Sequence, residues 1–125
     1  QYTQAAMVAE NKRLAAPAGV DTLPTSAMQE DHVSMGWGAA RKLRRSVANL
    51  RRILAVELVC AARGIELRAP LEPATGTGAA LRALRGVVPG HGPDRWLSPE
   101  LAAAEQLIAS GALLESVELA VGGLD

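Results

Sequence analysis

The stretch SMGWGAARKLRRSVANLRRILAVELVCAAR, residues 34–63, decides the fold of this chain. Its apolar residues recur every three or four positions, as one face of an α-helix requires. We therefore expect one long helix over about residues 34–63. Ser34 or Asp31 can cap its start, and Gly64 suits the left-handed position after its end. The expected apolar face consists of Trp37, Ala40, Leu43, Val47, Leu50, Leu54, Leu58 and Ala61.

Such a helix is long for a chain of 125 residues. Roughly 30 residues at 1.5 Å each give a rod of about 45 Å. A compact domain of this chain length has a radius of gyration of about 14 Å, and hence a diameter of roughly 36 Å. The helix would overhang its own domain. We therefore expect it to pack against other parts of a longer chain or against other subunits.

The composition favours an all-α fold. Hydrophobic residues make up 49% of the chain, but aromatic residues make up 2% and phenylalanine is absent. A core built from Ala, Leu, Val and Ile favours close-packed helices over a β-sandwich. The 13 basic and 13 acidic residues balance, so the net charge indicates no class of partner.

Other features bear on where the protein works. The single cysteine, Cys60, cannot form an internal disulfide and is expected to be a small core residue, which fits a reducing compartment such as the cytoplasm. No segment has the roughly 18 uninterrupted apolar residues of a membrane span, and no signal peptide is visible. The chain opens on Gln1 within a helical pattern, so we expect it to be a piece of a longer protein.

Shorter helices are expected on both sides of the long one. Residues 1–16 read as the end of a helix that Pro17 stops, and residues 17–33 read as an ordered loop. Residues 64–125 are expected to form short helices, over about 75–85, 98–109 and 112–120, with Thr75 and Ser98 near two of their starts as possible caps. No part of the chain alternates cleanly enough to predict a strand.

Four polar residues, Gln29, Glu30, Asp31 and His32, stand together where the loop meets the long helix. Polar groups crowded against a helix start are often binding or catalytic groups. A carboxylate such as Glu30 can accept a hydrogen bond from a substrate or take part in proton transfer, and the Gln29 amide can both donate and accept. From the spacing alone, the alternative is that Glu30 and Asp31 cap the helix and complement its dipole.

The chain resembles the histidine ammonia-lyases of the aromatic amino-acid lyase and mutase family. The resemblance covers nearly the whole chain and is densest from residue 1 to about residue 67. It is to the C-terminal part of a much longer enzyme. The matching pieces are Gln1-Tyr2-Thr3, Ala9-Glu10-Asn11-Lys12, Val20 to Ala27, Gln29 to Gly36, and Ala40-Arg41-Lys42-Leu43.

This resemblance implies an all-α segment of a large helical-bundle enzyme that converts L-histidine to urocanate and ammonia without oxidation, in histidine breakdown. It also implies a homotetramer whose active sites combine residues from different subunits. Glu30 would be a catalytic and substrate-binding residue, either as a proton-transfer group or as the acceptor for the substrate imidazole. Gln29 would also bind substrate. Asp31 and His32 are expected to orient or cap.

The resemblance further implies an electrophile, 4-methylidene-imidazol-5-one, which these lyases form by cyclising an internal Ala-Ser-Gly. Ala109-Ser110-Gly111 has that spelling, but it lies between two expected helices, whereas the family's tripeptide lies far upstream in a Gly-rich run followed by Asp-Leu-Ala-Pro. We expect it to serve as a helix break. The electrophile would then lie on an N-terminal portion upstream of Gln1 and the catalytic tyrosine would come from elsewhere, so residues 1–125 alone are expected to be inactive.

Two departures from the family pattern lie close to this candidate site. Met28 stands where the family usually reads Asn in Ser-Ala-Asn-Gln-Glu. Ala16 and Gly19 stand where the family usually reads His and Ser in Leu-Ala-His-Pro-Ala-Ser. An amide and an imidazole are thereby lost, which can alter the hydrogen bonds of the site and the choice of substrate.

Other functions remain open on the sequence. A related tyrosine or phenylalanine lyase or aminomutase is one, and a structural homologue without activity is another. A helical interaction module is a third, because six cations and no acid lie between residues 41 and 52; they are Arg41, Lys42, Arg44, Arg45, Arg51 and Arg52. No aromatic residues interleave with them and the chain is neutral, so we expect a solvated or interface face and no nucleic-acid partner.

No metal site or phosphate loop is expected. His91 lies in a Gly/Pro loop without a second ligand at metal spacing. The run Thr75-Gly76-Thr77-Gly78 is too short for a phosphate loop and lacks the lysine that follows one.

Overall fold

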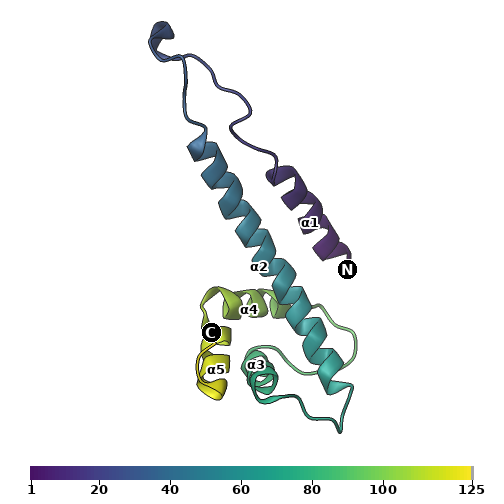
Figure 1. Ribbon diagram of the computed structural model, residues 1–125. Helices are drawn as coiled ribbons and strands as arrows, with labels where there is room; N and C mark the ends of the chain where they lie inside the picture. Colours follow the sequence, from purple (N-terminus) through teal and green to yellow (C-terminus); the bar gives the residue numbers. More distant parts are fainter. Residues whose placement is uncertain (125) are drawn as a thin grey trace. The chain divides into compact units, whose positions relative to one another are not determined.

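A computed structural model describes residues 1–124 of the chain, and in this range it is all-α, as the composition predicts. Its helices are α1 (Tyr2–Leu14), the short 3₁₀ helix η1 (Ser26–Met28), α2 (Gly36–Glu66), α3 (Thr75–Arg85), α4 (Ser98–Ala109) and α5 (Ala112–Val121) (Figure 1). The prediction of one long helix with shorter ones is confirmed, since α2 has 31 residues.

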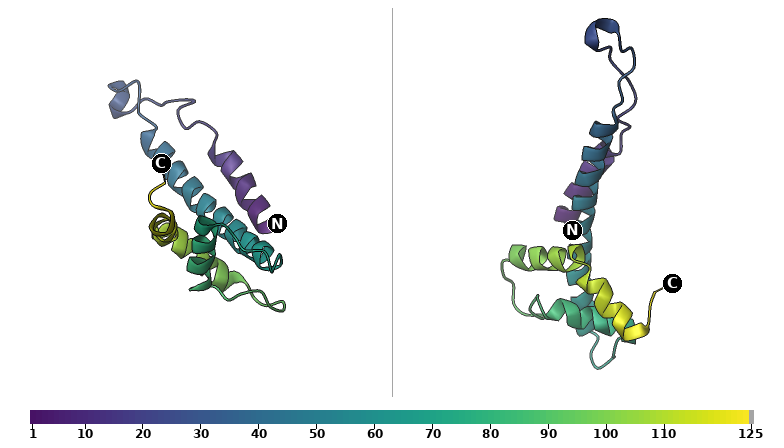
Figure 2. Two further views of the ribbon diagram at one scale, coloured as in Figure 1. Left: turned by 60° about the horizontal axis from the view of Figure 1, so that its bottom comes forward. Right: turned by 90° about the vertical axis from the view of Figure 1, so that its left-hand side faces the viewer.

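The chain divides into two compact units, Gln1–Leu50 and Arg51–Asp125. Helix α2 contributes its first half to the first unit and its second half to the other. In the first unit, α1 runs antiparallel beside this first half, and residues 15–35 connect them as a long loop (Figures 1 and 2).

Polar side chains join α1 to α2 in the first unit. The amide of Asn49, which is only 3% exposed, donates hydrogen bonds to the Glu10 carboxylate at 2.8 Å and to the Asn11 side-chain oxygen at 3.0 Å. The Asn11 amide in turn donates to the Ser46 carbonyl at 3.3 Å. Arg45 pairs with Glu10 at 2.6 Å. Because buried polar groups are costly unless they are bonded, this network fixes one register between the helices.

The second unit has the hydrophobic core. Its fully packed side chains come from α2, from α3 and the turn after it, and from α4; they are Ala55, Val59, Ala62, Leu84, Val88 and Ala104. Helix α5 packs on α3 and α4. A Cβ on Gly76 of α3 would lie 3.2 Å from the Val121 side chain, so the absent side chain lets α5 approach closely.

An ion pair between Arg85 and Glu66 connects α3 to the C-terminal end of α2 in this unit. Arg85 donates to both carboxylate oxygens of Glu66, at 2.5 and 2.9 Å, and also to the carbonyl of Pro89 at 3.1 Å. The backbone N–H of His91 donates to the same carboxylate at 3.4 Å. These bonds lower the pKa of Glu66, chiefly because of the Arg85 hydrogen bond.

Most of the apolar face expected on α2 is exposed in residues 1–124, although Leu58 packs partly buried against the core. Trp37 is 76% exposed and Leu43 is 65% exposed, and Val47, Leu50 and Leu54 are exposed as well. Of the buried positions in the second half, Ala55, Val59 and Ala62 each follow one residue after a position of that face, and Val56 is buried as well. The helical period is as expected, and the face buried within the chain lies beside the large apolar one, where small side chains allow neighbouring helices to approach.

The predicted helix caps need correction too. Gly64 lies inside α2, which continues to Glu66, and it does not have a positive φ angle. Leu97 is the N-cap of α4 and Ala74 is the N-cap of α3, and neither start has a side-chain cap, so Ser98 and Thr75 do not cap these helices. Cys60 is exposed rather than a core residue. Ser34 does accept a hydrogen bond from the Gly36 N–H at 3.2 Å.

Candidate functional site

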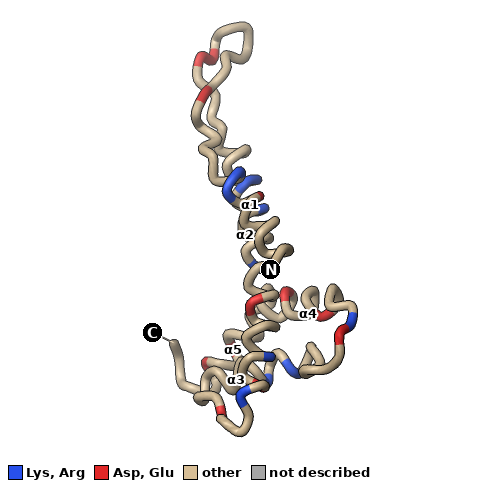
Figure 3. The backbone as a smooth tube through the Cα atoms, turned by 90° about the vertical axis from the view of Figure 1, so that its right-hand side faces the viewer, with Lys and Arg blue, Asp and Glu red and all other residues tan. Residues whose placement is uncertain are grey.

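The candidate site is the loop between α1 and α2, which contains the four polar residues found in the sequence. Between Arg13 and Arg41 the loop and its flanks have three acids, Asp21, Glu30 and Asp31, and no lysine or arginine. Figure 3 shows this segment with acidic positions only, while the basic positions begin on the helices. The loop therefore favours a cationic or hydrogen-bond-donating ligand over an anionic one.

Hydrogen bonds between Thr22 and Val33 join the two sides of the loop. The Thr22 hydroxyl donates to the Val33 carbonyl at 3.1 Å and accepts from the Val33 N–H at 2.8 Å. One side chain thus replaces a pair of backbone ladder bonds between residues that are 11 positions apart. These two bonds close the segment between Thr22 and Val33 into a loop.

Within this closed segment, Thr25 and Glu30 form an isolated antiparallel bridge. The Thr25 N–H donates to the Glu30 carbonyl at 2.9 Å, and the Glu30 N–H donates to the Thr25 carbonyl at 3.3 Å. The Thr25 hydroxyl also donates to Oε2 of the Glu30 carboxylate at 2.8 Å. The bridge therefore sets both the backbone and the side chain of Glu30.

The tip enclosed by this bridge has an unusual backbone. Ser26, Ala27 and Met28 have φ angles of 52°, 53° and 73°, so three consecutive residues other than glycine lie in the left-handed region. Such residues are held there only when the surrounding structure fixes them, and they are frequent at functional sites. No glycine marks this turn in the sequence, and the loop was predicted without the 3₁₀ helix η1.

The structure places Gln29 and Glu30 side by side at the end of the tip, and both are exposed. The Gln29 backbone N–H donates to the Ser26 carbonyl at 3.2 Å. Asp31 and His32 are exposed as well. Among the residues described, it is Ser34 and not Asp31 whose side chain bonds the first turn of α2.

This arrangement can bind but cannot enclose a small molecule by itself. A carboxylate and a primary amide on adjacent exposed residues can hold a donor such as an imidazole N–H or an ammonium group. Small-molecule sites are usually concave and bury most of the ligand. An exposed loop of this kind can therefore form at most one wall of such a site.

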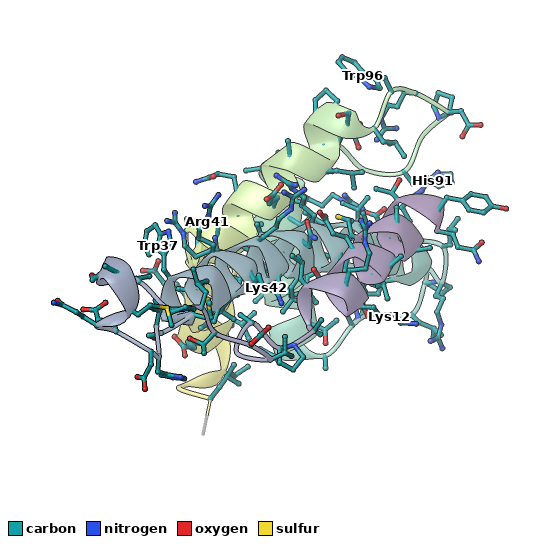
Figure 4. All side chains as sticks on the ribbon, turned by 90° about the horizontal axis from the view of Figure 1, so that it is seen from above. Lys12, Trp37, Arg41, Lys42, His91 and Trp96 are labelled. Carbon is teal, nitrogen blue, oxygen red and sulfur yellow. The ribbon has the colours of Figure 1, made fainter. Side chains whose placement is uncertain are left out.

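The basic cluster on α2 is partly used within the chain. Lys42 donates to the Ala16 carbonyl in the loop after α1, and Arg45 pairs with Glu10. Arg52 lies 3.4 Å from Glu105 in the second unit. Arg41 and Trp37 lie on the side of α2 that points away from α1, whereas Lys42 lies toward it (Figure 4). Three of the six cations thus bond other parts of the fold.

Two residues that matter here were missed in the sequence. Asn49 lies in a stretch with Arg44, Arg45, Arg51 and Arg52, so its residue type and neighbours gave no signal that it is buried. The residue type of Thr25 does not indicate its role in the site. Its importance comes from the bridge to Glu30, which depends on the left-handed tip.

Ala109-Ser110-Gly111 forms a break between α4 and α5, as its flanks predict. Gly111 has a φ angle of 83°, and the Ser110 hydroxyl donates to the Leu107 carbonyl at 3.1 Å. The Ser110 side chain is therefore engaged in closing the helix end. This conformation is that of a turn between two helices.

Within residues 1–124, no three His, Cys, Asp or Glu side chains are grouped closely enough to hold a metal ion. His91 and Trp96 lie in the connection between α3 and α4, with Trp96 extended away from the helices (Figure 4). In the same part of the chain, none of the helices has the length and apolar character that crossing a membrane requires.

Known proteins resemble this chain over the same helices and loop. The family model described as aromatic amino acid lyase matches residues 1–86, which include α1, the candidate loop, α2 and α3. The chain belongs to the aromatic amino acid lyase family. Histidine ammonia-lyase of Streptomyces griseus is 58% identical over 127 residues, and that of Streptomyces avermitilis is 56% identical over 125 residues; each match covers 99% of this chain.

Solved structures agree with this assignment to the aromatic amino acid lyases. Histidine ammonia-lyase from Trypanosoma cruzi matches 95% of this chain with a TM-score of 0.90 and 40% identity. A tyrosine aminomutase from Streptomyces globisporus matches 98% of it with a TM-score of 0.91 and 29% identity. The chain spans about a quarter of the length of these relatives, 24% and 25% of the two Streptomyces lyases.

Proposed function

We propose that residues 1–125 form the C-terminal part of a histidine ammonia-lyase, which removes ammonia from L-histidine without oxidation and leaves urocanate. The observation that carries this proposal is the 56–58% identity to two histidine ammonia-lyases over nearly the whole chain. The exposed loop, which has three acids and no lysine or arginine, supports it, since a substrate with an imidazole and an ammonium group presents donors to such a surface.

In this proposal Glu30 and Gln29 form one wall of the active site. The Glu30 carboxylate accepts a hydrogen bond from the substrate imidazole or takes up a proton during elimination. The Gln29 amide, next to it on the tip, donates to or accepts from the same substrate. Both side chains are exposed in this chain, which leaves them open to a ligand that approaches from outside the loop.

The proposed enzyme depends on a 4-methylidene-imidazol-5-one, which supplies an electrophile that activates the amino group of the substrate for departure. We assign its formation to an Ala-Ser-Gly upstream of this segment, because Ser110 and Gly111 are engaged in the α4–α5 turn. The residues of this chain would bind and orient the substrate against it. The segment alone would then have no lyase activity.

The proposal includes a cytoplasmic homotetramer that acts in histidine breakdown, with no nucleic-acid or membrane partner. Exposed apolar side chains along α2 support an assembly with further protein. Trp37, Leu43 and Leu50 are 76%, 65% and 48% exposed. A row of large apolar side chains on one helix is typical of a surface that other protein covers.

Substrate specificity tests this proposal directly. The intact lyase, with residues 1–125 at its C-terminal end, would be assayed against L-histidine, L-tyrosine and L-phenylalanine, with urocanate and the two aryl acrylates followed by ultraviolet absorbance. We expect urocanate formation alone. Turnover of tyrosine or phenylalanine without histidine would refute the assignment. Urocanate formation by residues 1–125 alone would refute the expected division of the site.

A tyrosine or phenylalanine lyase or aminomutase is the second candidate. The fit to tyrosine aminomutase, with a TM-score of 0.91, shows that the same helical arrangement serves that class. Chiral separation of β-amino acids from a tyrosine incubation would detect the aminomutase reaction. A helical module that binds nucleic acid through α2 is the remaining alternative, and salt-independent or absent binding would dismiss it.

A further inference from the structure

Thr25 contacts Glu30 in three ways. Their backbones exchange two hydrogen bonds, at 2.9 and 3.3 Å. In addition, the Thr25 hydroxyl donates to Oε2 of the Glu30 carboxylate at 2.8 Å. A hydroxyl at this distance from a carboxylate forms a charge-assisted bond, which is stronger than a neutral one.

The left-handed tip brings these two residues together. Four residues separate Thr25 from Glu30, and three of them have positive φ angles. The Met28 N–H also donates to the Thr25 carbonyl, at 3.1 Å. The turn is therefore wound tightly enough for a short threonine side chain to reach the glutamate side chain, which an open loop would not allow.

The hydrogen bond leaves the carboxylate half available. Oε2 accepts the Thr25 hydroxyl, and the described residues provide no hydrogen-bond partner for Oε1. A glutamate side chain on an exposed loop otherwise samples several rotamers, and fixing it before the substrate binds lowers the entropic cost of binding.

We propose that Thr25 is a positioning residue for Glu30: it holds the carboxylate by Oε2 and directs Oε1 toward the substrate imidazole or the transferred proton. This inference rests on the proposed function, because it assigns Thr25 no role apart from Glu30. A purely structural role, in which Thr25 only closes the loop through its backbone, is the alternative that the experiment must separate.

The test uses the intact lyase with L-histidine as substrate. Thr25→Val removes the hydroxyl but keeps the branched side chain and both backbone bonds, and we expect kcat/KM to fall about tenfold, as for loss of one hydrogen bond to a charged group. Thr25→Ser keeps the hydroxyl and should restore most of the activity. Thr77→Val makes the same change on an exposed residue of α3 and should leave activity unchanged.

A double-mutant cycle with Glu30→Ala shows whether Thr25 acts through Glu30. In the Glu30→Ala background, Thr25→Val should change kcat/KM less than twofold. Equilibrium binding of urocanate, measured by calorimetry, gives the same cycle without turnover. Thermal unfolding of each variant checks the fold.

The outcomes separate the two proposals. Wild-type kinetics in Thr25→Val, or an equal loss with and without Glu30, would overturn the positioning role alone. Unchanged kinetics in Glu30→Ala would instead overturn the site assignment of the proposed function, whatever Thr25 does.

Discussion

The Asn49 amide in α2 donates a hydrogen bond of 2.8 Å to the Glu10 carboxylate in α1, and it is almost completely buried. The candidate loop begins where α1 ends and finishes where α2 begins. The register between these two helices therefore determines where the two ends of the loop lie. A network that fixes this register therefore helps to position Glu30, although it does not contact that residue.

Removal of this amide should weaken the first unit. Asn49→Ala removes the donor to Oε2 of Glu10 and to the Asn11 side-chain oxygen, while Arg45 still pairs with Glu10, and leaving such acceptors unsatisfied costs about 1–3 kcal/mol of unfolding free energy. Chemical denaturation followed by circular dichroism measures the change. Gln106→Ala removes an amide from an exposed position of α4 and should change the stability by less than about 0.5 kcal/mol. Equal effects from both variants would show that the network does not fix the helices.

Acid should weaken the second unit through Glu66. Its pKa lies below the ordinary value of 4.5, first because Arg85 donates hydrogen bonds to the carboxylate. A lowered carboxyl pKa contributes stability that is present above pH 4.5 and is lost as the pH falls through the lowered folded-state value.

Glu66→Gln should therefore lower stability at neutral pH and reduce the loss of stability below pH 4.5. Thermal unfolding across this pH range measures the slope. Glu72→Gln, at an exposed position, is the control and should keep the wild-type slope. A Glu66→Gln profile parallel to wild type would contradict the role of the ion pair.

Two glycines should respond in opposite directions to alanine. Gly64 lies inside α2, and a Cβ added there would meet no atom within 4 Å, so Gly64→Ala should stabilise the chain by up to about 1 kcal/mol through helix propensity. Gly111 has a φ angle of 83°. Gly111→Ala should therefore destabilise by about 1–2 kcal/mol. Destabilisation by Gly64→Ala in a denaturant titration would contradict the position of Gly64 inside α2.

Met28→Asn should relax the tip of the candidate loop. Met28 has a φ angle of 73°, and asparagine tolerates the left-handed region better than methionine does. Asparagine is also the residue that the family usually has at this position. We expect a stabilisation of up to about 1 kcal/mol in denaturant unfolding. Met28→Leu keeps an apolar side chain at the same backbone angle and should give no gain.

Much of the fold was accessible from the sequence because helical periodicity and breaks are local properties. The start of α4 at Ser98 and its end at Ala109, and the break at Gly111, follow from Pro, Gly and apolar spacing. The buried face of α2 did not follow. Trp37 and Leu43 dominate the pattern by size, whereas Ala55 and Ala62 are buried because other helices pack on them.

The candidate site was accessible only in part. The density of polar groups at Gln29 and Glu30 and the family resemblance located it. The positive φ angles of Ser26 and Ala27, and hence the approach of Thr25 to Glu30, could not be predicted, because neither residue type favours that conformation. They depend on the bonds that close the loop on both sides.

The most direct test of the central claim is the turnover of L-histidine by the intact lyase with Glu30→Gln, beside Asp31→Asn as the matched control on the next residue. If Glu30 forms a wall of the active site, Glu30→Gln should lower kcat/KM for urocanate formation about 100-fold or more, as the loss of a proton-transfer group does. Asp31→Asn should stay within about threefold of wild type, since a surface change without a bonded partner has a small effect. Wild-type kcat and KM in Glu30→Gln would contradict the account.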